Sequence, residues 1–126
     1  MISVLYVDDD PDIQEIAMMA FSLDPELAVR TASSGVEALS ILDSGMTPDL
    51  LLLDMMMPGM DGPATLAAIR ERSRLADIPA VFFTARARAG EHEAIAALGA
   101  AGVIAKPFDP MMLAAELRVF ATGGPP

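Results

Sequence analysis

Residues 50–62 read LLLLDMMMPGMDG: four leucines, an aspartate, and a loop that contains proline and glycine. An uninterrupted apolar run such as Leu50–Leu53 is typical of a central parallel strand that is covered on both faces of its sheet. Asp54 follows this run directly. The stretch therefore predicts a buried strand with a carboxylate at its carboxyl end.

On either side of this strand, short apolar segments alternate with longer amphipathic segments. Because five strand–helix units fit in the chain, we expect an α/β fold, a doubly wound five-stranded parallel sheet with helices on both faces. The other expected strands are Ser3–Val7, Ala28–Ala32, Ala80–Phe83 and Gly102–Ala105, and the expected helices are Pro11–Leu23, Val36–Asp43, Pro63–Arg72, Glu91–Leu98 and Asp109–Phe120, the last with Asp109 as its N-cap.

The length and composition fit one domain. The chain has 126 residues, of which we assign 1–121 to the domain and 122–126 (TGGPP) to a tail that reads as a frayed end or a cut linker. Hydrophobic residues make up 53% of the chain, which is enough material for a buried core. The absence of cysteine excludes disulfides, thiolate metal ligands and cysteine nucleophiles.

The formal net charge of −10 argues against a nucleic-acid-binding surface, since phosphate backbones need a basic partner. No basic region precedes the first strand, so the N-terminus does not resemble a signal peptide. The apolar stretch Ala94–Ala105 is too short to cross a bilayer. We therefore expect a soluble cytoplasmic protein with no membrane insertion and no direct nucleic-acid binding.

Polar residues follow four of the expected strands. In open parallel sheets, ligands bind beyond the carboxyl ends of the strands, near a topological switch point. We therefore expect a functional site where these residues meet. Asp8 and Asp9 follow the first strand, Asp54 the third and Thr84 the fourth, and the fifth runs into Lys106, the only lysine of the chain.

This set of residues suits phosphoryl chemistry with a divalent cation. Carboxylates that lie close together repel unless a cation joins them, and Mg²⁺ prefers carboxylate, water and phosphate oxygens. A hydroxyl and an ammonium group could bind the remaining oxygens of a phosphoryl group. A carboxylate can itself be the nucleophile of phosphoryl transfer.

Each residue alone has an ordinary structural interpretation. Aspartates after strands often form turns or cap helices, and we assign Asp10 and Asp12 to capping or solvent-exposed roles. A lone Thr84 would be a strand-end hydroxyl, and a lone Lys106 a surface charge. The agreement of four strand ends favours a site.

Four motifs occur in an order and spacing that resemble a known family. With them the chain resembles, over nearly its whole length, the receiver domain of bacterial two-component response regulators, and it is similar to the single-domain chemotaxis type. The resemblance implies the flavodoxin-like fold of receiver domains. The motifs are VLYVDDDP (Val4–Pro11), LLLDMMMPGMDG (Leu51–Gly62), FFTA (Phe82–Ala85) and AKPF (Ala105–Phe108).

The resemblance implies that Asp54 accepts a phosphoryl group from a phosphohistidine on a sensor histidine kinase or a histidine phosphotransfer protein. Thr84 would then hydrogen-bond the phosphoryl group and Lys106 would pair with another of its oxygens. The resemblance also implies a cis Lys106–Pro107 bond.

A Mg²⁺ cofactor is implied in the same way. Asp9 and Asp54 would bind the ion directly, Asp8 would act largely through water, and the backbone carbonyl of Met56 would complete the protein ligands. The downstream protein target is unknown, and phosphorylation-dependent dimerisation stays open.

The chain departs from the family pattern at three places. Val103 stands three residues before Lys106, where the family commonly has an aromatic switch residue, so movement of Thr84–Gly90 would have to report the state instead. Met56 and Arg86 stand at the rim, where polar groups often orient water, which predicts a long-lived phosphoryl group. The third departure is a set of methionines that suits either a docking surface or simple filling: Met55, Met56, Met57, Met60, Met111 and Met112.

Three functional interpretations remain. The first is a stand-alone phosphoacceptor that signals through protein contacts and is not a turnover enzyme. The second is the receiver of a longer regulator with a DNA-binding or enzymatic output domain. The third is a Mg²⁺-dependent phosphatase with an aspartate nucleophile, which fits less well because such enzymes usually open with an Asp-x-Asp motif and carry a later acidic pair.

Overall fold

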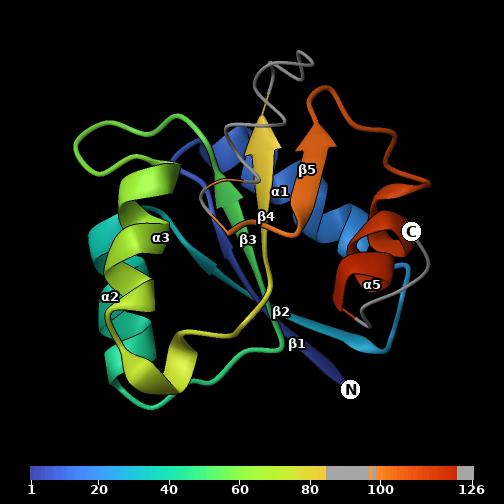
Figure 1. The fold of residues 1–126 in the computed structure, drawn as a ribbon. Helices are drawn as coiled ribbons and strands as arrows, with labels where there is room; N and C mark the ends of the chain where they lie inside the picture. Colours follow the sequence, from blue (N-terminus) through green and yellow to red (C-terminus); the bar gives the residue numbers. More distant parts are fainter. Residues whose placement is uncertain (85–96, 98, 122–126) are drawn as a thin grey trace.

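The computed structural model describes residues 1–84, 97 and 99–121, whose backbone forms a five-stranded sheet flanked by helices (Figure 1). The strands are β1 (Ile2–Val7), β2 (Leu27–Ala32), β3 (Leu50–Asp54), β4 (Ala80–Thr84) and β5 (Gly102–Ala105). The helices are α1 (Pro11–Phe21), α2 (Gly35–Asp43), α3 (Gly62–Arg70), the short 3₁₀ helix η1 (Ser73–Leu75) and α5 (Leu113–Ala121).

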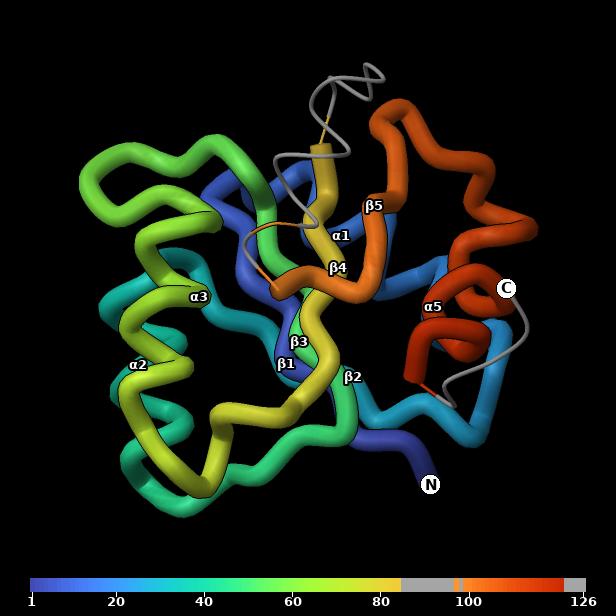
Figure 2. The backbone as a smooth tube through the Cα atoms, in the orientation of Figure 1, coloured from blue at the N-terminus to red at the C-terminus, as the bar shows by residue number. Residues whose placement is uncertain are grey.

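The sheet has the order β2-β1-β3-β4-β5, and all its strand pairs are parallel. Helices α2 and α3 cover one face, and α1 and α5 cover the other (Figure 1). This arrangement confirms the doubly wound α/β fold. The chain runs from β1 to β2 on one side and returns to β3 on the other, so a topological switch point lies between β1 and β3. Figure 2 shows the segments that follow β3 and β5 at the same edge of the sheet.

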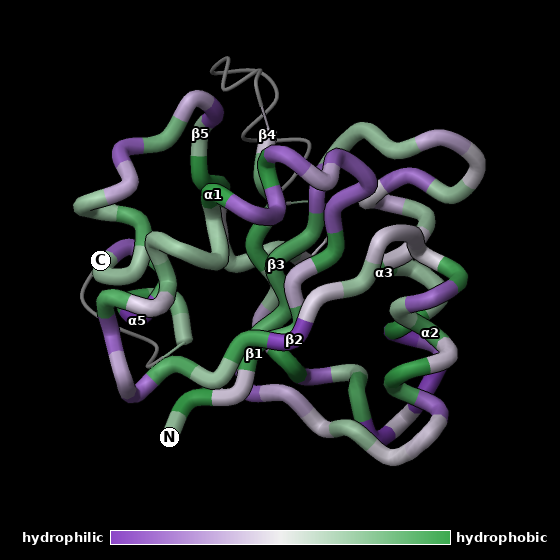
Figure 3. The backbone as a smooth tube through the Cα atoms, turned by 180° about the vertical axis from the view of Figure 1, so that it is seen from behind, coloured by the Kyte–Doolittle hydropathy of each residue, from purple (hydrophilic) through white to green (hydrophobic). Residues whose placement is uncertain are grey.

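Strand β3 lies at the centre of the sheet because its side chains are apolar on both faces. All four of its leucines are 0% exposed. Leu51 and Leu53 belong to the core beneath α2 and α3, whereas Leu50 and Leu52 belong to the core beneath α1 and α5. In Figure 3 the hydrophobic colour fills much of the sheet, and hydrophilic colour appears where the chain leaves its upper edge.

The helix ends differ modestly from the expected ones. Helix α1 stops at Phe21, and Ser22 follows it as the C-cap. Asp109 does accept a hydrogen bond from the Met111 amide (2.9 Å), as expected of a capping residue, but a turn follows and the regular helix starts only at Leu113. The expected helix 91–98 lies outside the described residues except for residue 97, as does the tail 122–126.

Two further expectations concern the backbone. The Lys106–Pro107 peptide bond is cis, as the resemblance implies. Asp10 is the N-cap of α1, where its side chain accepts hydrogen bonds from the amides of Asp12 and Ile13. Across the described part of the chain, no helix has the length and apolar character needed to span a membrane.

Candidate functional site

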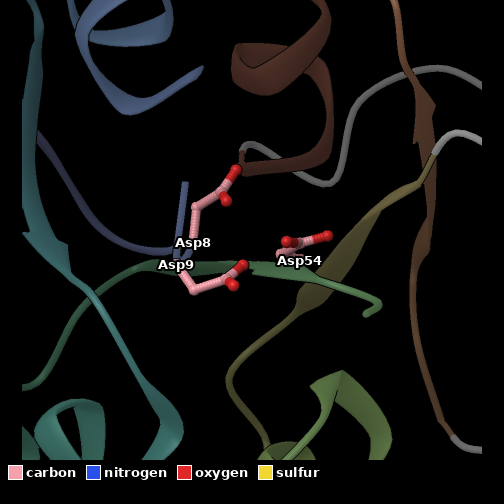
Figure 4. Close-up of side chains that lie close together, drawn as sticks. All are labelled: Asp8, Asp9 and Asp54. Atoms are coloured by element: carbon pink, nitrogen blue, oxygen red, sulfur yellow. The ribbon is translucent and has the colours of Figure 1, made fainter. Parts of the chain in front are cut away.

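Three carboxylates converge at the carboxyl ends of β1 and β3. Asp8 and Asp9 follow β1, Asp54 ends β3, and one carboxylate oxygen from each lies within 4.8 Å of the others (Figure 4). Asp8 is fully buried and Asp54 is 6% exposed, whereas Asp9 is exposed. Above them lies a pocket of about 280 Å³, lined by Asp9, Asp10, Asp54, Met56, Thr84 and Lys106.

Backbone contacts fix the loop that carries Asp8. The Asp8 amide donates to the Ala32 carbonyl at 3.0 Å, which extends the pairing of β1 with β2. The side-chain amide of Gln14 on α1 donates to the Asp8 carbonyl and, at 3.3 Å, to the Ala32 carbonyl. The Asp10 amide donates to Asp8 Oδ1 at 3.0 Å, so the start of α1 and the end of β1 hold the same carboxylate.

The loop after β3 is held just as closely. The Met55 amide donates to the Phe83 carbonyl and the Gly62 amide to the Met55 carbonyl, both at 3.0 Å. Gly62 is required at this point, because a Cβ there would lie 2.4 Å from the Asp54 carbonyl oxygen. The loop therefore returns close to the strand that carries Asp54.

Lys106 connects the two buried carboxylates. Its Nζ lies 3.2 Å from Asp8 Oδ2 and 3.4 Å from Asp54 Oδ1, and 4.8 Å from the centroid of the Phe83 ring. Its backbone amide donates to the Thr84 carbonyl at 2.7 Å, which ties the end of β5 to the end of β4. Among the described residues, the three converging carboxylates therefore share one ammonium group nearby, that of Lys106.

This imbalance affects the protonation of Asp54. Burial, followed by the negative charge of Asp8, raises the pKa of Asp54 to about 6, and the positive charge of Lys106 opposes the rise. The donor set consists of carboxylate oxygens, which are the ligands that hard divalent cations prefer. The residues present therefore fit a Mg²⁺ ion, which would relieve the repulsion.

Tyr6 is a site residue that the sequence analysis missed. Its hydroxyl donates to Asp8 Oδ2 at 2.8 Å, and its side chain is fully buried. Burial and the bond to Asp8 raise the pKa of Tyr6 far above its usual range, so the hydroxyl remains a donor. The spacing could have revealed it, because residues two apart on a strand point to the same face.

All six expected site residues lie at this edge of the sheet. Thr84 ends β4 at 4% exposure, and Met56 is 72% exposed at the rim. Val103 packs, partly buried, against the core beneath α2 and α3. Arg86 and most of the segment Thr84–Gly90 lie outside the described residues. Of the methionines, Met57 is buried, whereas Met111 and Met112 are exposed.

Known proteins resemble this chain in both sequence and fold. Residues 4–118 match the family described as the response regulator receiver domain. An uncharacterized 14.6 kDa protein of Leptolyngbya boryana is 36% identical over 98% of this chain and 92% of its own length. Response regulator Rre1 of Synechocystis is 35% identical over 93% of this chain, which spans only 50% of that protein.

Among solved structures, chemotaxis protein CheY4 of Vibrio cholerae aligns with a TM-score of 0.85 and 30% identity, covering 95% of this chain and 98% of that one. A CheY-like receiver domain protein of Methanospirillum hungatei aligns with a TM-score of 0.77 and 31% identity, covering 96% and 94% of the two chains. The converging carboxylates, the sheet order and these matches agree, and the chain belongs to the family of response regulator receiver domains.

Proposed function

We propose that Asp54 is the phosphoacceptor of this receiver domain and takes its phosphoryl group from a phosphohistidine on a sensor histidine kinase or a histidine phosphotransfer protein. Phosphoacceptance is the general role of the family. The observation that supports Asp54 most directly is its position, with its carboxylate next to Asp8 and Asp9 and 3.4 Å from the Lys106 ammonium.

The reaction requires an ionised carboxylate. A pKa of about 6 leaves Asp54 largely ionised at neutral pH. One of its oxygens attacks phosphorus, a new O–P bond forms, and the N–P bond to the donor histidine breaks with its electron pair passing to the imidazole nitrogen. Lys106 and Thr84, which line the same pocket, would hold two of the phosphoryl oxygens.

Asp9, Asp54 and the backbone carbonyl of Met56 would hold a Mg²⁺ ion, with Asp8 acting largely through water. Three carboxylate oxygens within 4.8 Å support this assignment. The bound ion would supply positive charge against the phosphoryl oxygens. Without it, the crowded carboxylates would repel an incoming phosphoryl group.

Intact-protein mass spectrometry tests the proposal. We expect the parent, incubated with acetyl phosphate and Mg²⁺, to gain one phosphoryl mass, and Asp54→Ala to gain none. Asp12→Ala is a matched control, because Asp12 is an exposed aspartate that belongs to α1 rather than to the site. A gain of mass in Asp54→Ala, or no gain in the parent with either acetyl phosphate or a phosphorylated kinase, would contradict the assignment.

For the output, we propose signalling through protein contacts by a chain that is not a turnover enzyme. The near-complete match to the Leptolyngbya protein supports a stand-alone receiver. The half-length match to Rre1 supports the alternative of a receiver within a longer regulator. The length of the native gene product distinguishes the two, and steady turnover of a phosphomonoester would indicate a phosphatase instead.

A further inference from the structure

Asp8 depends on three hydrogen-bond donors for its buried carboxylate. Oδ1 accepts from the Asp10 amide at 3.0 Å, and Oδ2 accepts both from the Tyr6 hydroxyl at 2.8 Å and from Lys106 Nζ at 3.2 Å. The side chain of Asp8 is 0% exposed. A buried ionised carboxylate is stable only while such partners remain.

The function proposed above requires Lys106 to leave Asp8 when Asp54 is phosphorylated. Its ammonium group is shared between Asp8 and Asp54, at 3.2 and 3.4 Å. When it turns to an oxygen of a phosphoryl group on Asp54, it can no longer keep the same contact with Asp8. Oδ2 would then lose its charged donor inside the protein.

Tyr6 is held in place by two aromatic rings in addition to its hydrogen bond with Asp8. Its ring contacts Phe21 edge-on with centroids 5.9 Å apart, and contacts Phe83 at 6.0 Å. Both rings are buried in the core beneath α1 and α5. Tyr6 lies on β1, two residues before Asp8, and its contact with Phe21 keeps its hydroxyl near Asp8 when Lys106 moves.

We infer that Tyr6 is a positioning residue of the phosphoacceptor site, whose hydroxyl retains Asp8 while Lys106 moves from Asp8 to the phosphoryl group. The inference rests on the function proposed above. Tyr6 acts through Asp8 rather than through a contact with the phosphoryl group or with the Asp54 oxygen that accepts it. Its hydroxyl should therefore matter more in the phosphorylated state than in the free state.

Binding of beryllofluoride, a phosphoryl mimic, in the presence of Mg²⁺ tests this inference by calorimetry. We expect Tyr6→Phe, which keeps the ring and removes the hydroxyl, to bind beryllofluoride about tenfold more weakly than the parent. Thr65→Val is the matched control, because it also removes a buried hydroxyl, one that donates to the Asp61 carbonyl rather than to Asp8. It should stay within about twofold of the parent.

The tyrosine absorption band gives a second readout that needs no metal. The chain has one tyrosine and no tryptophan, so this band reports Tyr6 alone. In Lys106→Met, Tyr6 becomes the only side-chain donor to Asp8 Oδ2 among its observed partners. The stronger hydrogen bond should move the band to longer wavelength than in the metal-free parent.

The outcomes separate the inference from the proposed function. Equal beryllofluoride affinity of Tyr6→Phe and the parent, an equal loss in Thr65→Val, or an unmoved tyrosine band in Lys106→Met would each overturn the inference and leave the phosphoacceptor assignment standing. No beryllofluoride binding by the parent would overturn the proposed function, and the role of Tyr6 with it.

Discussion

Replacing Asp54 by asparagine should stabilise the metal-free protein at neutral pH. Burial, followed by the charge of Asp8, raises the pKa of Asp54 from 3.8 to about 6, although Lys106 opposes the rise. The folded state therefore holds this proton more tightly than the unfolded chain does. The associated stability is fully present below pH 3.8 and is lost as the pH rises through about 6.

The expected gain follows from the size of the pKa shift. A rise from 3.8 to about 6 corresponds to about 3 kcal/mol, since one pKa unit equals about 1.4 kcal/mol. Asparagine keeps the shape of the side chain and carries no charge to bury. The free energy of unfolding of Asp54→Asn should exceed that of the parent by on the order of 3 kcal/mol at pH 8, and by clearly less at pH 5.

Urea unfolding followed by circular dichroism, in a buffer with chelator, measures this difference between pH 5 and pH 8. Asp12→Asn is the control, because Asp12 is exposed and its removal should give no comparable trend. Added Mg²⁺ should narrow the gap, since binding to the carboxylates stabilises the folded parent. A gap that stays constant with pH, or a less stable Asp54→Asn at pH 8, would refute the electrostatic reasoning.

Three further predictions concern the rim, the loop and the helix start. Met56→Asn should shorten the lifetime of the phosphoryl group, measured by mass after the donor is removed, because asparagine can orient water where the exposed methionine cannot; equal or slower decay would oppose this. Gly62→Ala should lower the free energy of unfolding by about 1–3 kcal/mol and weaken Mg²⁺ binding, because its Cβ would meet the Asp54 backbone. Gly102→Ala is the control: the nearest neighbours of its Cβ belong to the ring of Phe120, so Mg²⁺ affinity should stay unchanged. Asp10→Ala should cost about 1 kcal/mol in urea unfolding through the lost N-cap of α1 and leave Asp54 able to accept phosphate.

The sequence was most informative where chemistry and periodicity coincide. The leucines of β3 predicted an inner strand because inner strands of the sheet, unlike its edge strands, bury side chains on both faces. The residues after the strands were placed at one edge because parallel strands share their direction. The family matches confirm the receiver domain that these patterns indicated.

Contacts between distant segments could not be predicted in the same way. The position of Lys106 between Asp8 and Asp54 depends on the register of β4 with β5, which pairs Thr84 with Ala105. The start of α5 was misplaced because Asp109 has the sequence of a cap and does accept a capping bond, yet a turn separates it from Leu113. Tyr6 was interpreted from the sequence as one more apolar residue of the first strand, and its hydroxyl was overlooked.

The pairing of the strands gives the two sides of the site different stiffness. Strands β1 and β3, which carry the carboxylates, are each paired on both edges, so the acidic side resists displacement. In the described part of the chain, β5 pairs only with β4, and Lys106 follows this outer strand. Local opening is easiest where fewest ladder bonds must break, so amide hydrogen exchange should be faster in β5 than in β1 or β3. A ligand at the pocket should therefore displace β5 and α5 more than β1 or β3. A partner that distinguishes the states of Asp54 would find the largest structural difference at β5 and α5.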